Sequence, residues 1–326
     1  MRMKTKINLI LIALILGMAS LSGGAATGVA ADFHTSALES TLSILPVRLS
    51  GSSGSAVSES RPEEPEGSGV VVFDGRYVAT AAHVLNGADR VRVRMHDGRV
   101  AWARIVGQDR FTDIALLHIG DTLPPFVVSE DVSVGDDVCT VGNQFGLGLS
   151  ITCGVISAVH RSNAGFNPIE DFIQTDAVVN PGASGGALIN DHGRLVGMLS
   201  GIFTKDSDAD VGVNFAVHGP FLMRILEDLK DHGRVRRAKS GMVVQALSLV
   251  EREAQTGVRI LRVAADSAAA RAGLRPDDVI VTMAGRHIRY PSDVSAIVYG
   301  YRVGDAITLE RERDGVLSSV DLILGE

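Results

Sequence analysis

The sequence is poor in cysteine, aromatic residues and positive charge, and each shortage excludes a class of protein. Its 326 residues include two cysteines, one tryptophan and 5% aromatic residues, with 31 lysines and arginines against 38 aspartates and glutamates. Two cysteines are too few for a disulfide-based scaffold or a four-cysteine metal site. A net charge of −7 argues against a nucleic-acid-binding protein, which needs a basic surface. Burial of apolar side chains must therefore stabilise the fold, and a chain of 326 residues is long enough to supply it.

A long apolar run occurs at the N-terminus. Three basic residues within the first six precede an apolar stretch over residues 7–21, and small residues continue to Ala31. This order is that of a secretory signal peptide, and the stretch is shorter than the ~20 residues that span a bilayer. We expect residues 1–31 to be an export signal, cleaved near Ala26, Ala30 or Ala31, with an uncleaved anchor as the alternative. The protein is then periplasmic or secreted, and contacts a membrane only if the leader is uncleaved.

Composition divides the remaining chain into three parts and a short basic linker. Residues 32–68 are expected to be an N-terminal segment and flexible loop, because residues 50–69 are rich in Ser, Gly, Pro and Glu. Residues 69–235 contain many short β-rich runs separated by turns, a texture typical of a barrel or sandwich, and an amphipathic helix is predicted from Pro220 to about His232. Residues 241–326 alternate predicted strands and short helices, with a hairpin about Asp314-Gly315, and form a small α/β domain.

Three residues that are far apart in the sequence have the chemistry of nucleophilic catalysis. Ser184 lies in Gly182-Ala183-Ser184-Gly185-Gly186, where the absence of a side chain on Gly182 allows backbone N–H groups to face a developing oxyanion. A serine hydroxyl needs a neighbouring base, and His83 follows an apolar strand. The base needs an anion to orient it, and Asp113 begins another apolar strand. Singly, these residues read as a turn serine, a core histidine and a strand-edge aspartate; together they predict a catalytic triad.

The surroundings and order of these residues resemble the HtrA/Deg family of chymotrypsin-like serine proteases. The resemblance rests on Thr80–Val84, Asp113–Leu117 and Gly182–Gly186, and on a C-terminal segment, Asp266–Leu274, that is similar to PDZ domains. It implies a mainly β fold, a chymotrypsin-like double β-barrel over residues 69–235 followed by a small α/β PDZ domain over residues 241–326. It also implies catalysis by His83, Asp113 and Ser184.

The resemblance further implies roles for residues around the triad. The oxyanion hole is expected from the N–H groups of Gly182, Ala183 and Ser184. Four positions are expected to form the substrate pocket: Val178, Ser200, Asn214 and Phe215. The peptide groove of the PDZ domain is expected at Gly241, Met242, Val243 and Ile297. Arg161 matches the family's sensor-loop arginine, although it can equally be a solvated loop residue.

Several residues depart from the family pattern without removing a triad group. Ala183 replaces the usual Asn and Gln144 replaces a common Pro. Asn214 and His218 interrupt the usual Gly-Phe-Ala-Ile-Pro segment. With Val178 near the pocket and no acid there, we expect cleavage after small or medium apolar residues.

The functional expectation is an exported, ATP-independent serine endopeptidase that acts on unfolded or misfolded proteins, with regulation through the PDZ domain. Its expected partners are those substrates, peptide C-termini and two further copies of the chain, a homotrimer built on residues 33–49; no nucleic acid, cofactor or metal is expected. The alternatives are a catalytically weak chaperone or peptide-binding sensor with the same fold, and a signalling protease with one membrane-associated substrate.

The cysteine pairing stays open at this stage. Cys139 and Cys153 each lie seven residues from Gly146, so a hairpin would place them opposite one another, and an oxidising compartment permits a disulfide.

Overall fold

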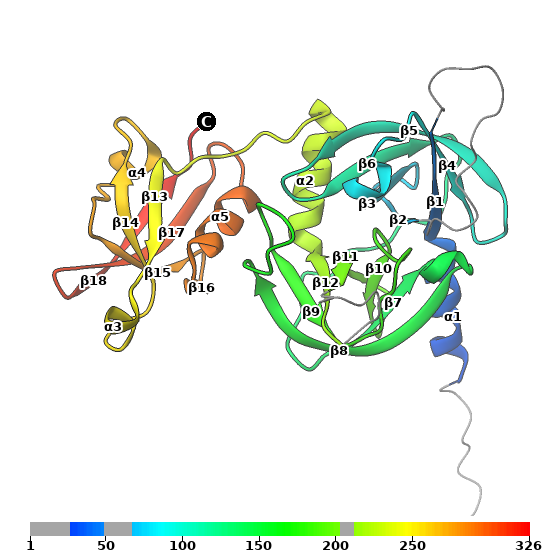
Figure 1. Cartoon of the computed structure of the whole chain (residues 1–326), viewed down its shortest axis with the longest axis horizontal. Helices are drawn as coiled ribbons and strands as arrows, with labels where there is room; N and C mark the ends of the chain where they lie inside the picture. The colour runs from blue at the N-terminus through cyan, green and yellow to red at the C-terminus, as the bar shows by residue number, and fades with distance from the viewer. Residues whose placement is uncertain (1–26, 49–66, 203–211) are drawn as a thin grey trace, which may run out of the picture.

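The computed structural model describes residues 27–48, 67–202 and 212–326. The apolar stretch of the expected leader and most of the Ser/Gly-rich segment lie outside the described residues. The described part contains two closed barrels of six strands each and a third, separate sheet with helices beside it (Figure 1). The expected double β-barrel and PDZ-like domain are therefore confirmed.

The first barrel has the strand order β1-β2-β3-β6-β5-β4. Its strands are β1 (Thr41–Val47), β2 (Gly67–Val72), β3 (Tyr77–Ala81), β4 (Arg90–Arg94), β5 (Val100–Asp109) and β6 (Ile114–Ile119). The 3₁₀ helix η1 (Ala82–Leu85) follows β3 directly. Valine, isoleucine and leucine side chains from all but β5 of these strands are buried inside the barrel, which provides the apolar burial that the composition requires.

This barrel begins earlier than the sequence predicts. The expected boundary at residue 69 leaves β1 outside the domain, but β1 pairs with both β2 and β4 and closes the barrel. It is preceded by α1 (Thr27–Glu39), whose Phe33 packs against the apolar cluster that both barrels share. Because the apolar side chains Leu42, Ile44 and Val47 are buried within their own chain, they are not available for the expected trimer contact.

The second barrel has the strand order β10-β11-β12-β9-β8-β7. Its strands are β7 (Asp137–Gly142), β8 (Ser150–Arg161), β9 (Phe172–Thr175), β10 (Ala187–Asn190), β11 (Leu195–Ile202) and β12 (Asn214–His218). The 3₁₀ helix η2 (Gln144–Gly146) connects β7 to β8. The helix α2 (Gly219–His232) follows β12, has Pro220 in its first turn and is capped by Gly233 in a left-handed conformation, as its sequence predicts.

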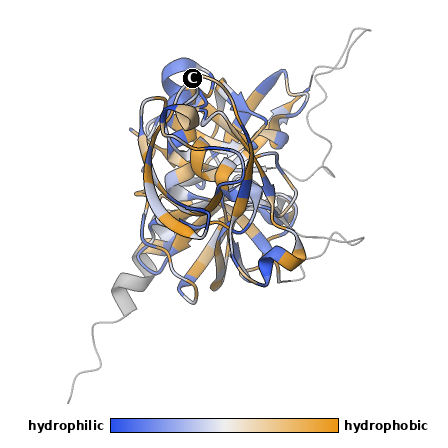
Figure 2. Ribbon diagram, turned by 90° about the vertical axis from the view of Figure 1, so that its left-hand side faces the viewer, coloured by the Kyte–Doolittle hydropathy of each residue, from blue (hydrophilic) through white to orange (hydrophobic). Residues whose placement is uncertain are grey.

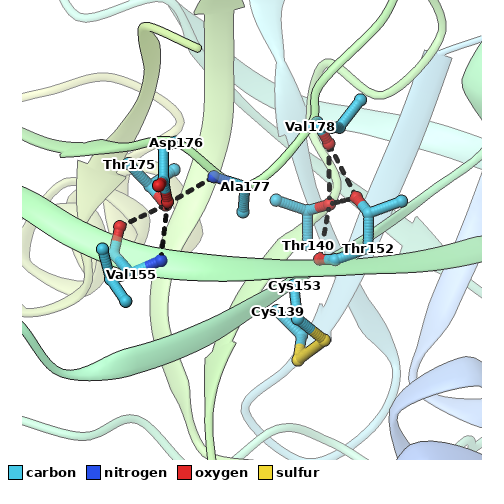
Figure 3. The surroundings of a disulfide bond; sticks show 9 residues. All are labelled: Cys139, Thr140, Thr152, Cys153, Val155, Thr175, Asp176, Ala177 and Val178. Atoms are coloured by element: carbon cyan, nitrogen blue, oxygen red, sulfur yellow. Dashed lines mark hydrogen bonds between the residues drawn. A yellow bond between two sulfur atoms is a disulfide. The ribbon is translucent and has the colours of Figure 1, made fainter.

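Cys139 and Cys153 form a disulfide between β7 and β8 (Figure 3). The two residues are direct partners in the antiparallel register, which resolves the alternative left open by the sequence. The next pair in the ladder, Thr140 and Thr152, joins its hydroxyl groups at 2.6 Å. The disulfide and this hydroxyl pair therefore fasten the same stretch of the β7–β8 hairpin.

The third sheet has six strands: five follow the order β13-β14-β15-β17-β18, and β16 pairs with β15 beside this path. Its elements are β13 (Met242–Ala246), α3 (Leu249–Arg252), β14 (Val258–Val263), α4 (Ala268–Arg271), β15 (Val279–Met283), β16 (Arg286–His287), α5 (Pro291–Gly300), β17 (Ala306–Arg313) and β18 (Val316–Ile323). Strand β13 is an edge strand, and α5 lies beside it (Figure 1). Figure 2 shows apolar and polar residues mixed along the ribbon, as expected for elements with one buried face.

Within the described ranges, no helix is both long and apolar enough to cross a membrane.

Candidate active site

His83 and Asp113 form a closely bonded pair at one end of the first barrel. The Asp113 carboxylate accepts a hydrogen bond from His83 Nδ1 at 2.6 Å and from the His83 backbone N–H at 2.8 Å, and the Asp113 carbonyl accepts one from the N–H of Ala82. Asp113 adopts a φ of 58°, a conformation that is costly for a residue with a side chain. The histidine side chain is 47% exposed, the aspartate 14%, so the pair presents the imidazole outward and keeps the carboxylate behind it.

Ser184 lies on a tight turn of the second barrel, between Gly182 and strand β10. Gly182 has a φ of 95° and Gly185 a φ of 86°, values that L-residues rarely adopt. A Cβ atom on Gly185 would lie 2.1 Å from the Ser68 carbonyl oxygen and 3.0 Å from the Ala81 nitrogen. Only glycine at position 185 allows the serine turn to approach the strand that leads to His83.

Ser68 of strand β2 fastens this turn to the first barrel. Its N–H donates to the Ser184 carbonyl at 2.8 Å, and its hydroxyl donates to the Gly182 carbonyl at 2.7 Å. The Thr80 hydroxyl donates in turn to the Ser68 carbonyl at 2.6 Å, three residues before His83. These contacts place the Ser184 turn beside the strand that leads to His83, at a junction between the two barrels, and among the described residues no hydrogen bond joins Ser184 Oγ to His83.

One departure from the family pattern, Gln144, takes part in holding the serine turn. Gln144 of η2 accepts a hydrogen bond from the Asn180 side chain at 2.7 Å, and the N–H of Phe145 donates to the Pro181 carbonyl at 2.6 Å. Ala183 is fully buried. These contacts fix the turn from the side of the second barrel.

The expected oxyanion donors divide into two groups. The Ala183 N–H donates to the Asn180 carbonyl at 3.0 Å, so this group closes the turn and is lost from the expected oxyanion hole. The N–H groups of Gly182 and Ser184 have no acceptor among the described residues. These two remain available as donors beside the serine hydroxyl.

The residues expected to form the substrate pocket occupy two different environments. Val178 is 39% exposed, and its carbonyl accepts hydrogen bonds from both Thr140 and Thr152 (Figure 3). Asn214 is buried and donates to the Ala177 carbonyl at 2.9 Å, and Ser200 is buried on β11. Phe215 packs in the core against two phenylalanine rings, at 5.4 and 5.7 Å, so we correct its expected role from pocket lining to core packing.

A groove of about 560 Å³ lies between β13 and α5 of the third domain. Gly241, Met242 and Val243 line it as expected. Ile297 does not: it is buried in the core of that domain, and Val294 and Val298 line the groove from α5 instead. Helical periodicity identifies the apolar positions of α5 but does not distinguish the core face from the groove face.

Arg161 ends β8 where the second barrel meets the third domain. Its Nε donates to the Gln174 side chain at 3.3 Å, and it lines a cavity of about 340 Å³ together with residues of both domains. Across the same boundary, the Ser162 hydroxyl contacts Ser292 at 3.0 Å and the buried carboxylate of Asp293.

A polar cluster at this boundary was not anticipated from the sequence, which marked His218 only as a departure from the family pattern. Asp171 accepts a hydrogen bond from His160 Nδ1 at 2.8 Å and contacts the guanidinium of Arg286 at 3.2 Å. Burial opposes the charge on Asp171, but the hydrogen bond from His160 and the charge of Arg286 outweigh it and lower its pKa. Burial lowers the pKa of His218 to about 4. The negative charge of Asp171 partly offsets this shift, and the interactions with His160 and Arg286 reinforce it.

Comparison with known proteins matches both halves of this architecture. Residues 67–198 match the family described as "Trypsin-like peptidase domain", and residues 210–324 match the family described as "PDZ domain". The periplasmic serine endoprotease DegP of Escherichia coli K12 is 35% identical over 268 residues, which are 79% of this chain and 56% of DegP. A probable DegP-like protein of Marinomonas is 36% identical over 266 residues, with the same coverage. The chain thus spans 56% of the length of these curated relatives.

Solved structures give a similar picture over nearly the whole chain. The HtrA-type protease AlgW with a tripeptide superimposes with a TM-score of 0.70 and 32% identity, covering 90% of this chain and 96% of AlgW. A serine endoprotease from Yersinia pestis superimposes with a TM-score of 0.59 and 29% identity, covering 91% of this chain and 97% of its own.

Proposed function

The chain belongs to the HtrA family of trypsin-like serine proteases that carry a PDZ domain, and from this premise we propose that it is a serine endopeptidase. The observation that carries the proposal is the junction at which His83, bonded to Asp113, meets the Ser184 turn through Ser68. An alcohol, an imidazole and a carboxylate contributed by two barrels have the roles that peptide-bond hydrolysis requires.

We propose one step of the reaction for each group. Asp113 accepts the Nδ1 proton of His83, so Nε2 is the free base that takes the proton of the Ser184 hydroxyl as its oxygen attacks the scissile carbonyl carbon. The N–H groups of Gly182 and Ser184 stabilise the oxyanion. His83 then returns the proton to the leaving amine, and water hydrolyses the acyl-enzyme by the same path.

The pocket beside this site is proposed to accept small or medium apolar side chains. Val178 offers an exposed apolar surface there, and its backbone is held by Thr140 and Thr152. A panel of peptides that differ only in the residue before the cleaved bond tests this preference.

The third domain is proposed to bind peptide C-termini by adding a strand to β13. Strand β13 pairs with β14 on one side only, and its free edge lines the groove opposite Val294 and Val298. Arg161, at the boundary with this domain, is proposed to relay its occupancy to the serine turn. A peptide with a free C-terminal carboxylate should raise the rate of labelling at Ser184, and the same peptide with an amidated C-terminus should not.

The setting of the activity is also proposed from the family. We expect an exported, periplasmic or secreted enzyme that cleaves unfolded or misfolded proteins without ATP and assembles as a homotrimer. DegP is named as periplasmic, and the first residues of this chain have the order of an export signal.

A fluorophosphonate probe tests the catalytic proposal. Wild-type protein should be labelled at one serine per chain, Ser184→Ala should not be labelled, and Ser133→Ala, a matched change on the surface of the same barrel, should be labelled like wild type. His83→Ala should reduce the labelling rate at least 100-fold. Absence of labelling even with an activating peptide would support the alternative, a peptide-binding chaperone or sensor that retains the protease fold.

A further inference from the structure

Three side chains with the chemistry of metal ligands gather away from the triad, where the second barrel meets the PDZ-like domain. His160 lies near the end of β8, Asp171 directly precedes β9, and His218 ends β12. One donor atom of each lies within 4.8 Å of the donor atoms of the other two. Strands β9 and β12 lie on the side of the barrel that faces the third domain (Figure 1).

His218 supplies a second, independent observation, because a buried polar atom of its side chain is left unsatisfied. The residue is 7% exposed, and its Nε2 atom is buried without a hydrogen-bond partner among the residues that the structure describes. A buried polar atom without a partner costs about 1–3 kcal/mol, and such atoms are rare in folded proteins. His160, by contrast, is tied to Asp171 through Nδ1 and has a side chain that is one-third exposed.

We propose that His160, Asp171 and His218 form a binding site for a divalent transition-metal ion of the Zn²⁺ class. Two imidazoles and one carboxylate suit zinc in preference to the harder ions Mg²⁺ and Ca²⁺, which prefer oxygen ligands alone. A tetrahedral ion with bonds of about 2.0–2.1 Å separates its ligand atoms by about 3.3 Å. Drawing the three donors together thus requires side-chain shifts of up to about 1.5 Å and leaves one position for water.

Arg286 of the PDZ-like domain competes with the ion for the same carboxylate. Its guanidinium contacts both oxygens of Asp171, at 3.2 and 3.4 Å. A second cation at this buried carboxylate repels the guanidinium, so metal binding displaces Arg286 and breaks this bond between the domains. The other contacts across this part of the boundary join Ser162 to Ser292 and Asp293 and are uncharged on the barrel side. The ion therefore acts on the coupling of the two domains.

Zinc binding to the full chain tests the site. Because His83 and Asp113 are also an imidazole and a carboxylate, the measurement uses a His83→Ala, Ser184→Ala background, in which neither catalysis nor autolysis interferes. Competition against a zinc-chelating dye should show one Zn²⁺ per chain. His218→Phe and Asp171→Asn should each weaken binding at least 100-fold, and His160→Gln, at the more exposed ligand, should weaken it at least tenfold. His192→Ala, which alters an exposed histidine next to Asp191, is the matched control and should leave binding unchanged.

Substitution of Arg286 should change zinc affinity in the opposite direction. Arg286→Gln should tighten zinc binding about tenfold. In a second measurement, an added protease cleaves the 234–240 linker. Zinc should accelerate this cleavage in the Ser184→Ala chain and should not change its rate in the Ser184→Ala chain that also carries Arg286→Gln. Melting curves identify any variant that fails to fold. The proposal is wrong if folded His218→Phe and Asp171→Asn bind zinc as tightly as the background protein, or if the background protein binds none. None of these measurements depends on the protein's own proteolytic activity, so they test the metal site separately from the catalytic proposal.

Discussion

Acidification should destabilise the protease domain through His218, and a substitution at this position should remove the effect. Burial keeps the imidazole neutral in the folded chain, where its pKa is about 4, whereas the unfolded chain has the ordinary value of 6.5. The groups that face it are His160, Asp171 and Arg286. A proton added to His218 therefore enters a buried site that already holds one guanidinium.

The direction and the size of the change in the free energy of unfolding follow from the difference in proton binding between the folded and the unfolded chain. Between pH 6.5 and about pH 4 the unfolded chain carries a proton at position 218 that the folded chain lacks, so stability falls as pH falls. The loss begins near 6.5, approaches ~1.4 kcal/mol per pH unit, and is complete below about pH 4. The gap between the two pKa values corresponds to roughly 3 kcal/mol, of which about 2.5 kcal/mol is lost between pH 7.5 and pH 4.5.

The assay compares urea unfolding of Ser184→Ala with that of Ser184→Ala, His218→Phe at several pH values, in the presence of a chelator. Circular dichroism and the fluorescence of Trp102, the one tryptophan in the sequence, follow the transition. Groups remote from position 218 titrate equally in both proteins, so the difference between the two curves reports on His218 together with the neighbours coupled to it, Asp171 and His160. Parallel stability curves from pH 7.5 to pH 4.5 would refute the reasoning, because they would show that His218 titrates alike in the folded and unfolded chains.

Three further changes test other parts of the structure. Gly185→Ala places a Cβ atom 2.1 Å from the Ser68 carbonyl oxygen and should lower fluorophosphonate labelling at least 100-fold while the chain still folds. Changing Cys139 and Cys153 together to serine removes a cross-link over 14 residues and should lower the free energy of unfolding by about 3 kcal/mol in urea titrations. Asp278→Asn neutralises a buried carboxylate that contacts two arginine side chains and should destabilise the PDZ-like domain by about 3 kcal/mol, measured by calorimetry, with labelling of the active-site serine unchanged.

The sequence predicted the features that depend on neighbouring residues. The helix expected from Pro220 to His232 spans Gly219–His232, because its apolar spacing and its terminal Pro and Gly are local signals. The hairpin about Asp314-Gly315 joins β17 to β18, and both turn residues have a positive φ, which is the conformation that this residue pair favours. The pairing of His83 with Asp113, which are 30 residues apart, has no local signal and was predicted from the resemblance of their two motifs to the HtrA/Deg family.

Features that arise from closure of the barrels were not predicted. Strand β1 is separated from its partner β2 by residues 48–66, so nothing local shows that it completes the first barrel. Phe215 is apolar on a strand that is buried on both sides, and alternation cannot tell core from pocket there. The cluster of His160, Asp171 and His218 exists because β8, β9 and β12 are neighbours in the second barrel, and a one-residue difference in register would separate these side chains.

The hydrogen bonds of Ser68 matter for any attempt to transfer the proposed active site to another protein. A single residue of the first barrel accepts a hydrogen bond from the Thr80 hydroxyl and donates to the Ser184 turn through both its amide and its hydroxyl, so the proposed nucleophile and the segment that carries the proposed base are tied to one residue. A graft that carries only the glycine-rich loop and the histidine segment into a new scaffold omits Ser68 and its hydrogen bonds. Such a graft should reproduce the residues of the site without their spacing.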